Sequence, residues 1–290
     1  MRILSLLPGA TEMVCAVGAE ASLVGVSHEC DHPASVAALP RVTVTPIDPS
    51  QASGAIDAQV RAARDAGRAV IGVDAAQLQA LAPDLVITQA LCDVCAVGDG
   101  AVQALAAALP RPPKVLVLGG RTVPGVADDL RAVGAATGHA DGAARAADRF
   151  LREIEQLALS GKRPRPRVLC LEWVDPPFTA GHWVPDLVHA AGGVDVAAQP
   201  GDHSARRTWA ELAALTPDVI VVMLCGFDVA RSRQELDRLP AGTLPEGPPV
   251  WIVDANAYTS RPGPRLAHGA RLLRAALEGG PDQEGLARWR

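Results

Sequence analysis

Short apolar runs recur along the chain, and each run ends at a turn signal and precedes a stretch with helical spacing. The runs are rich in Val, Ile and Leu and do not alternate with polar residues, which is typical of parallel strands buried on both faces. Strands that alternate with helices predict an α/β fold. The predicted strands are residues 3–7, 23–27, 70–72, 85–88, 115–118, 168–171, 219–224 and 250–253.

The two halves of the chain share one pattern. Residues 81–87 read Leu-Ala-Pro-Asp-Leu-Val-Ile, and residues 215–221 read Leu-Thr-Pro-Asp-Val-Ile-Val. In each copy a helix ends near Pro, Asp opens the turn and a buried strand follows. Between the copies, residues 140–159 have the spacing of one long helix. We therefore predict two Rossmann-like lobes with parallel sheets joined by one long backbone helix, divided as residues 1–122, 123–161 and 162–290.

Composition narrows the class of protein. The 290 residues are 49% hydrophobic and 20% charged, so the chain can bury a core. The net charge of −5 argues against a nucleic-acid partner, because such proteins usually carry a basic surface. No uncharged apolar stretch reaches about 18 residues, so we expect no membrane insertion. The positions of the five Trp residues are informative, because Phe, Trp and Tyr together make up only 3% of the chain.

The first residues also bear on the compartment. The apolar start of the chain is broken by Pro8-Gly9 and Glu12, earlier than in a signal peptide. We expect a cytoplasmic protein, and a periplasmic one only if the true start lies upstream. In a reducing compartment the six Cys favour free thiols or metal ligands over disulfides.

Ligands of open parallel sheets bind beyond the carboxyl ends of the strands. The scarce Cys, Trp, Phe and Tyr residues cluster at these predicted strand ends. This clustering is the strongest indication of a binding site. The candidate ligand-binding residues are Pro8, Gly9, Thr11, Glu12, His28, Glu29, Cys30, Cys92, Glu172, Trp173, Phe178, His182, Trp183, Phe227 and Tyr258.

Thiols and imidazoles suggest a metal as an alternative. Cys92 and Cys95 form a CxxC, which in the cytosol indicates a redox pair, half of a metal site or chance. With His28 and Cys30 from the neighbouring strand end, they could hold a transition metal such as zinc. These residues come from separate loops and lack the paired spacing of a zinc knuckle. Cys15 and Cys170 fall inside a predicted helix and strand and are expected to be packed in the core.

The aromatic residues after residue 171 indicate a pocket wall. Trp173, Phe178 and Trp183 flank a turn stiffened by Pro176-Pro177, and flat aromatic walls suit a large, flat, partly apolar ligand. The alternative is a core under a Pro-rich loop. His182 could contact a polar group or a metal.

The remaining expectations are helix caps at Asp228 and Asp254, structural or solvated roles for His139, His189, His203 and His268, and a frayed tail around Trp289.

Common catalytic motifs are missing. The sequence has no G-x-S-x-G, no Walker loop and no H-E-x-x-H. Gly119-Gly120 follows a strand, but the rest of a dinucleotide fingerprint does not follow. A ligand-binding protein is therefore favoured over an enzyme.

A family resemblance agrees with this prediction. Residues 3–12, Ile-Leu-Ser-Leu-Leu-Pro-Gly-Ala-Thr-Glu, and residues 23–30, Leu-Val-Gly-Val-Ser-His-Glu-Cys, resemble the opening of the helical-backbone (class III) periplasmic-binding-protein fold. The two Pro-Asp repeats and residues 134–138 fit it as well. That class binds vitamin B12 and iron–siderophores for ABC importers. The resemblance implies a ligand cleft between the lobes.

Three segments look closest to leaderless cobalamin-binding-like proteins. They are residues 27–30, 91–95 and 172–183. The resemblance implies a cytosolic carrier or sensor that binds cobalamin or a related corrinoid, a tetrapyrrole-like ligand, with an ABC importer or a corrinoid-using protein as partner. His182, His28 or a Cys would reach the cobalt. The alternatives are a metal-dependent or thiol enzyme using the Cys/His cluster, and a siderophore or heme binder with Arg206, Arg207 and Arg261 facing an anionic chelate.

Overall fold

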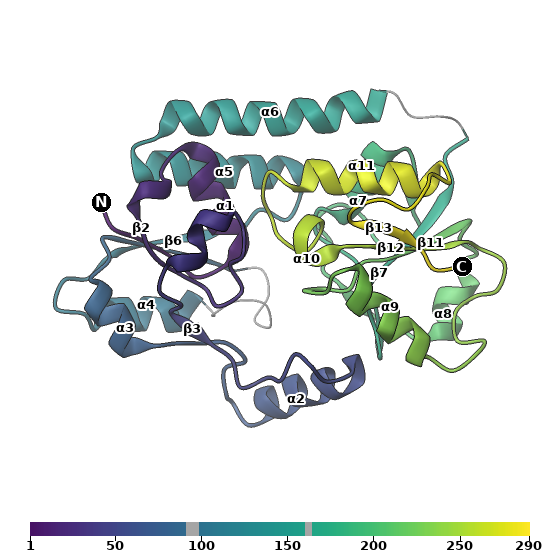
Figure 1. Ribbon diagram of the computed structural model, residues 1–290, viewed down its shortest axis with the longest axis horizontal. Helices are drawn as coiled ribbons and strands as arrows, with labels where there is room; N and C mark the ends of the chain where they lie inside the picture. The colour runs from purple at the N-terminus through teal and green to yellow at the C-terminus, as the bar shows by residue number, and fades with distance from the viewer. Residues whose placement is uncertain (91–98, 160–163) are drawn as a thin grey trace. The chain divides into compact units, whose positions relative to one another are not determined.

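The computed structural model describes residues 1–90, 99–159 and 164–290, and it has the predicted α/β class with two compact units (Figure 1). Each unit has its own sheet. The helix α6 (Ala140–Leu159), which has the predicted bounds, begins in unit 1 and ends in unit 2. Unit 1 comprises Met1–Gln51, Ala58–Gly120 and Pro124–Arg149, and unit 2 comprises Ala52–Asp57, Arg121–Val123 and Phe150–Arg290.

Unit 1 is built from short strands that are linked mainly by helices. Two further helices, α2 (Ser53–Asp65) and α5 (Val123–Thr137), also cross a boundary between the units. The elements within unit 1 are β1 (Ile3–Ser5), α1 (Pro8–Val17), η1 (Glu20–Ser22), β2 (Leu23–Val26), η2 (Ala34–Ala38), β3 (Thr43–Val44), β4 (Gly72–Val73), α3 (Ala75–Leu81), β5 (Leu85–Gln89), α4 (Asp99–Ala107) and β6 (Lys114–Leu118).

The main sheet of unit 1 has four parallel strands in the order β2-β1-β5-β6. Its central strands β1 and β5 are fully buried, as their runs of Val, Ile and Leu predict, and the edge strand β6 is partly exposed. The strand predicted at residues 70–72 is displaced to Gly72–Val73 (β4) and lies outside the main sheet. Val70 and Ile71 pack in the core, and the strand that follows them, β4, pairs antiparallel with β3 in a separate small sheet.

Unit 2 has a larger, mixed sheet. Its strands follow the order β10-β8-β7-β11-β12-β13, in which β7, β11 and β12 are parallel, and β9 pairs parallel with β7 off this path. The elements of unit 2 are β7 (Arg167–Val174), β8 (Pro177–Thr179), α7 (Val184–Ala191), β9 (Val194–Asp195), β10 (Ala205–Arg206), α8 (Trp209–Ala214), β11 (Val219–Val222), α9 (Val229–Arg238), β12 (Val250–Val253), α10 (Ala255–Tyr258), α11 (Leu266–Leu277) and β13 (Leu286–Arg288).

The expected frayed tail is instead ordered. The strand β13 pairs antiparallel with β12, and the Trp289 indole N–H donates to the Asp237 carboxylate at 2.7 Å. The outer edge of β12 offers unpaired backbone groups, and the tail satisfies them. This pairing adds an antiparallel strand to the parallel core of the sheet.

Helices cover both faces of the unit 2 sheet (Figure 1). On one face α7 packs against α11. On the other, α8 and α9 bury Leu212 and Leu236 against Leu169, Ile220 and their neighbours on the sheet. This second core also receives the half-buried Trp173 at the end of β7. The sheet therefore holds the strand ends of unit 2 in a fixed register.

Local chemistry sets several helix ends. Gly18 closes α1 with a φ of 95°, a conformation that favours Gly. The predicted caps are confirmed, since Asp228 accepts the Arg231 N–H at 2.7 Å and Asp254 accepts the Ala257 N–H at 2.8 Å. In the described ranges, every helix is too short or too polar to cross a membrane.

Candidate ligand-binding site

In unit 1, short polar side chains lie beyond the ends of β1 and β2. The Thr11 hydroxyl is 2.8 Å from the Ser5 hydroxyl and 3.1 Å from the Cys30 thiol. All three side chains are buried. The predicted contact residues Pro8, Gly9, Thr11 and Glu12 form the buried start of α1, so their side chains mainly support this strand end.

A second series of hydrogen-bonded polar side chains lies in the same loop region. The His28 Nδ1 atom is 2.6 Å from the Thr43 hydroxyl, which donates to the Ser27 hydroxyl at 2.9 Å. Arg41 donates to the Cys30 carbonyl at 2.7 Å and ties down the same loop. The sequence therefore placed His28, Glu29 and Cys30 correctly in one loop after β2.

The predicted metal cluster is only partly described. Cys92 and Cys95 lie outside the described residues, so the four-residue site with His28 and Cys30 stays a prediction. Among residues 1–90, 99–159 and 164–290, no three His, Cys, Asp or Glu side chains gather as a metal site would require. The four Cys residues described there are free thiols.

In unit 2, an aromatic pair lies at the carboxyl ends of β7 and β11. The ring centroids of Trp173 and Phe227 are 5.3 Å apart, with an angle of 44° between their planes. The Trp173 indole N–H donates to the Asp175 carbonyl at 3.1 Å. Phe178 on β8 pairs with Trp173, and Arg206 on β10 lies opposite Phe178. Two half-buried aromatic side chains and an exposed cation thus share this edge.

His182 is held in an unusual backbone conformation. Its φ is 54°, its N–H donates to the Asp202 carbonyl at 2.6 Å, and its own carbonyl accepts the Gly201 N–H at 2.9 Å. A Cβ at Gly181 would lie 2.6 Å from the Asp202 carbonyl oxygen, so only Gly fits beside it. These backbone hydrogen bonds therefore hold the Cα of His182, and so the point from which its side chain extends, in one position.

The imidazole of His182 has one unused nitrogen. Its Nε2 atom is covered by protein atoms and has no hydrogen-bond partner. Burial, with smaller contributions from His203 and Arg121, lowers the pKa of His182 below its usual value. The ring is therefore neutral at pH 7, the form in which imidazole binds metals. A metal would reach Nε2 only after the side chain turns.

Sequence reasoning missed two residues beside His182. The His203 ring lies edge-on to the His182 ring at 5.5 Å, and the Arg121 guanidinium is 2.9 Å from His203 Nε2. We expected His203 to be structural or solvated. Arg121 comes soon after the end of β6, so the rule that selected the other strand ends could have selected it. No spacing in the sequence links residue 203 to residue 182.

Trp183 is buried, whereas Tyr258 is only half-buried. Trp183 is 6% exposed, and its indole N–H donates to the Thr259 carbonyl at 2.8 Å. Tyr258 stacks beside His268 at 4.5 Å. Burial, helped by Glu284, raises the pKa of Tyr258, so its phenol stays protonated at neutral pH. Their roles in ligand binding, like that of the half-buried Glu172, stay predictions.

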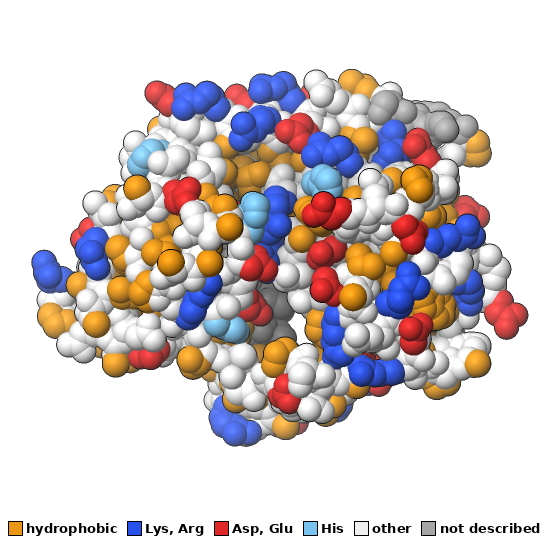
Figure 2. All heavy atoms as spheres, in the orientation of Figure 1, with side chains coloured by type: hydrophobic (Ala, Val, Ile, Leu, Met, Phe, Trp, Pro, Cys, Tyr) orange, Lys and Arg blue, Asp and Glu red, His pale blue; other side chains and the backbone are white. Residues whose placement is uncertain are grey.

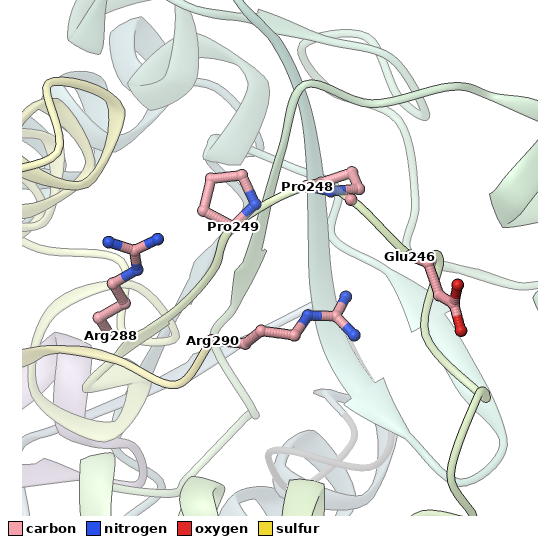
Figure 3. A pocket seen from close by; sticks show the side chains of 6 residues that line it. Glu246, Pro248, Pro249, Arg288 and Arg290 are labelled. Carbon is pink, nitrogen blue, oxygen red and sulfur yellow. The ribbon is translucent and has the colours of Figure 1, made fainter.

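The other edge of this sheet has a shallow hollow (Figure 3). Its volume is about 400 Å³, and Pro248, Pro249, Arg288, Arg290 and Glu246 line it just before β12. The Arg290 guanidinium already donates to the Pro245 carbonyl at 2.6 Å. None of the predicted site residues lines this hollow.

Charges are mixed on the face of unit 2 seen in Figure 2. Acidic and basic side chains alternate there, and no basic area stands out.

Three comparisons place the chain among known proteins. A family model described as "Periplasmic binding protein" matches residues 3–241. No curated protein matches the chain in sequence. Several solved structures share the fold at low identity.

Two of those structures bind heme by their descriptions. A periplasmic heme binding protein from Pseudomonas aeruginosa has a TM-score of 0.72 and 19% identity, covering 99% of this chain and 97% of that one. The periplasmic heme-binding protein RhuT from Roseiflexus sp. RS-1 has a TM-score of 0.70 and 22% identity, covering 96% and 98%. A third, the periplasmic vitamin B12 binding protein BtuF of Vibrio cholerae, has a TM-score of 0.67 and 20% identity, covering 97% and 98%.

Proposed function

This chain belongs to the periplasmic binding protein family, and we propose that it binds a metal-centred tetrapyrrole-like ligand, with cobalamin or a related corrinoid as the first candidate. As a substrate-binding protein of this family, it would present the ligand to an ABC importer or to another corrinoid-using protein.

The aromatic pair at the end of β7 carries the proposal. Trp173 and Phe227 lie 5.3 Å apart at the edge where ligands of parallel sheets bind, and the half-buried Phe178 lies on the next strand. Flat, partly apolar rings suit such a surface. Each aromatic contact adds about 0.5–1.5 kcal/mol beyond the burial of area. Aromatic contacts could thus bind a corrinoid with few hydrogen bonds or ion pairs to it.

His182 supplies the metal-directed part of the proposal. Its unpartnered Nε2 and its lowered pKa suit an axial ligand of cobalt or iron. His28 is the second candidate, because the hydrogen bond between its Nδ1 and the Thr43 hydroxyl at 2.6 Å would orient its ring for binding through Nε2. We assign the axial position to His182 first because its Nε2 has no partner.

Heme is the second candidate, and the cations near the aromatic edge favour it. Arg206 lies opposite Phe178, and Arg121 lies near His182 through His203. Guanidinium groups recognise carboxylates such as the propionates of heme. Arg261 is a weaker candidate, because it is buried and donates to the Asn256 side chain at 2.7 Å.

A titration that follows the visible spectrum tests the proposal. The purified protein is titrated separately with hydroxocobalamin, cyanocobalamin and hemin, and the affinity is measured by calorimetry. Tight binding of a cobalamin with an altered spectrum supports a corrinoid protein in which the chain supplies an axial ligand. Preference for hemin, lost in Arg206→Ala, moves heme to first place. If all three bind more weakly than ~100 μM, about −5.5 kcal/mol, the proposed ligand class is wrong.

A further inference from the structure

A short segment from the first half of the chain is packed into unit 2. The segment Ala52–Asp57, which we name the strap, includes the first turn of α2. The buried Ser53 N–H donates to a Glu235 carboxylate oxygen at 2.7 Å. The Ser53 carbonyl accepts the Trp173 indole N–H at 3.3 Å, and Ile56 packs against the core beside Phe227. The strap thus touches one of the proposed ligand contacts directly.

Glu235 is the charged centre of this arrangement. Only 2% of it is exposed, and its carboxylate forms ion pairs with Arg231 at 3.0 Å and with Arg238. A buried carboxylate is costly unless charged and polar partners compensate for its lost hydration. Two guanidinium groups and the Ser53 N–H provide that compensation. Removing any of them would weaken the hold on the strap.

The contacts close into a ring. From Glu235, Arg231 reaches the face of Phe227, with its guanidinium carbon 4.9 Å from the ring centroid. Phe227 contacts Trp173, and Trp173 returns through its indole N–H to Ser53, which donates to Glu235. Glu235 is therefore linked to both members of the aromatic pair. It reaches Trp173 through the backbone of Ser53 and Phe227 through the guanidinium of Arg231.

We propose that Glu235 is a positioning residue for ligand binding: the closed ring Glu235–Arg231–Phe227–Trp173–Ser53 holds the strap on unit 2 and orients the Trp173–Phe227 pair toward the ligand. The inference rests on the proposed function, since it takes the pair as a ligand contact. The Trp173 indole N–H is shared between the Ser53 carbonyl at 3.3 Å and the Asp175 carbonyl at 3.1 Å, so opening the ring removes one of its two polar restraints.

Two variants open the ring at different points. Glu235→Gln keeps the size of the side chain but removes the charge that holds Arg231. Ser53→Pro removes the N–H that binds Glu235, together with the Ser53 hydroxyl, at the first position of a helix, where Pro is tolerated. Glu153→Gln is the matched control, because it breaks an exposed Arg–Glu pair with Arg271 away from the ring.

Hydrogen exchange tests the strap without any ligand. In Glu235→Gln and Ser53→Pro, amides of residues 54–57 should exchange about tenfold faster than in the wild type, and in Glu153→Gln at the wild-type rate. Unchanged exchange in both ring variants would mean that the ring does not hold the strap, and the inference would be wrong.

Titration with hydroxocobalamin and hemin tests the positioning role. For whichever probe the wild type binds, Glu235→Gln should weaken binding about tenfold. In a Trp173→Leu background, the same change should weaken binding less than about threefold, because the pair it positions is gone. An equal loss in both backgrounds, or no loss, refutes the role. Failure of the wild type to bind either probe refutes the proposed function itself, and exchange still decides whether Glu235 holds the strap.

Discussion

Asp195 makes the stability of unit 2 depend on pH. It lies in β9, is 8% exposed, and accepts the N–H groups of Ala197 and Ala198 on one carboxylate oxygen, while the other has no partner. Burial outweighs these two hydrogen bonds and raises the pKa of Asp195 from 3.8 to about 6. The nearby Cys170 thiol, whose pKa burial also raises, stays neutral throughout this range.

The sign of the effect follows from the raised pKa. Below pH 3.8 both the native and the unfolded state carry the proton, and Asp195 costs nothing. As the pH rises toward 6, the unfolded state ionises first, so stability is lost. The loss is complete above the folded pKa. A shift of about 2 pKa units at about 1.4 kcal/mol each corresponds to a loss of about 3 kcal/mol.

Replacing Asp195 by Asn should remove this pH dependence. Urea unfolding is measured from pH 4 to pH 8 for the wild type and Asp195→Asn. All five Trp residues lie in unit 2, so Trp fluorescence reports the unfolding of that unit. The variant should gain stability over the wild type between pH 4 and pH 6, by up to about 3 kcal/mol, and the difference should then stay constant. Parallel curves, or a wild type that gains on the variant as the pH rises, would refute the reasoning.

Two further substitutions and one reactivity measurement have defined outcomes. His182→Asn should keep the fold, because Asn tolerates a positive φ, but should abolish the spectral change with hydroxocobalamin; an unchanged spectral response excludes His182 as axial ligand. Thr208→Ala removes the capping box of α8 and should cost about 1 kcal/mol in urea unfolding, whereas no loss would mean that the cap contributes nothing. Cys15, whose pKa burial and the neighbouring Glu20 and Glu12 raise to about 12, should react with iodoacetamide at pH 8 far more slowly than a free thiol.

Local patterns were sufficient for much of the fold. The strand Val250–Val253 and the helix Ala140–Leu159 have the predicted bounds, because apolar runs and helical spacing are properties of neighbouring residues. The caps at Asp228 and Asp254 follow from side chains three residues from their partners. The placement of Trp173 and Phe227 near strand ends follows from the rule for parallel sheets, whereas His182 follows the antiparallel strand β8.

Tertiary packing decided the rest. Nothing near residue 289 predicts that the tail completes the edge of β12, and nothing near residue 203 predicts its contact with His182. The Pro-rich neighbourhood of Trp183 does not predict the hydrogen bond from its indole N–H to the Thr259 carbonyl. The bond between Ser53 and Glu235 joins residues 182 positions apart. The sequence by itself determined the elements, their order and the edges that carry chemistry, because these depend on local spacing; only the folded chain decided which remote side chains share a contact, because that depends on how the sheets and helices pack.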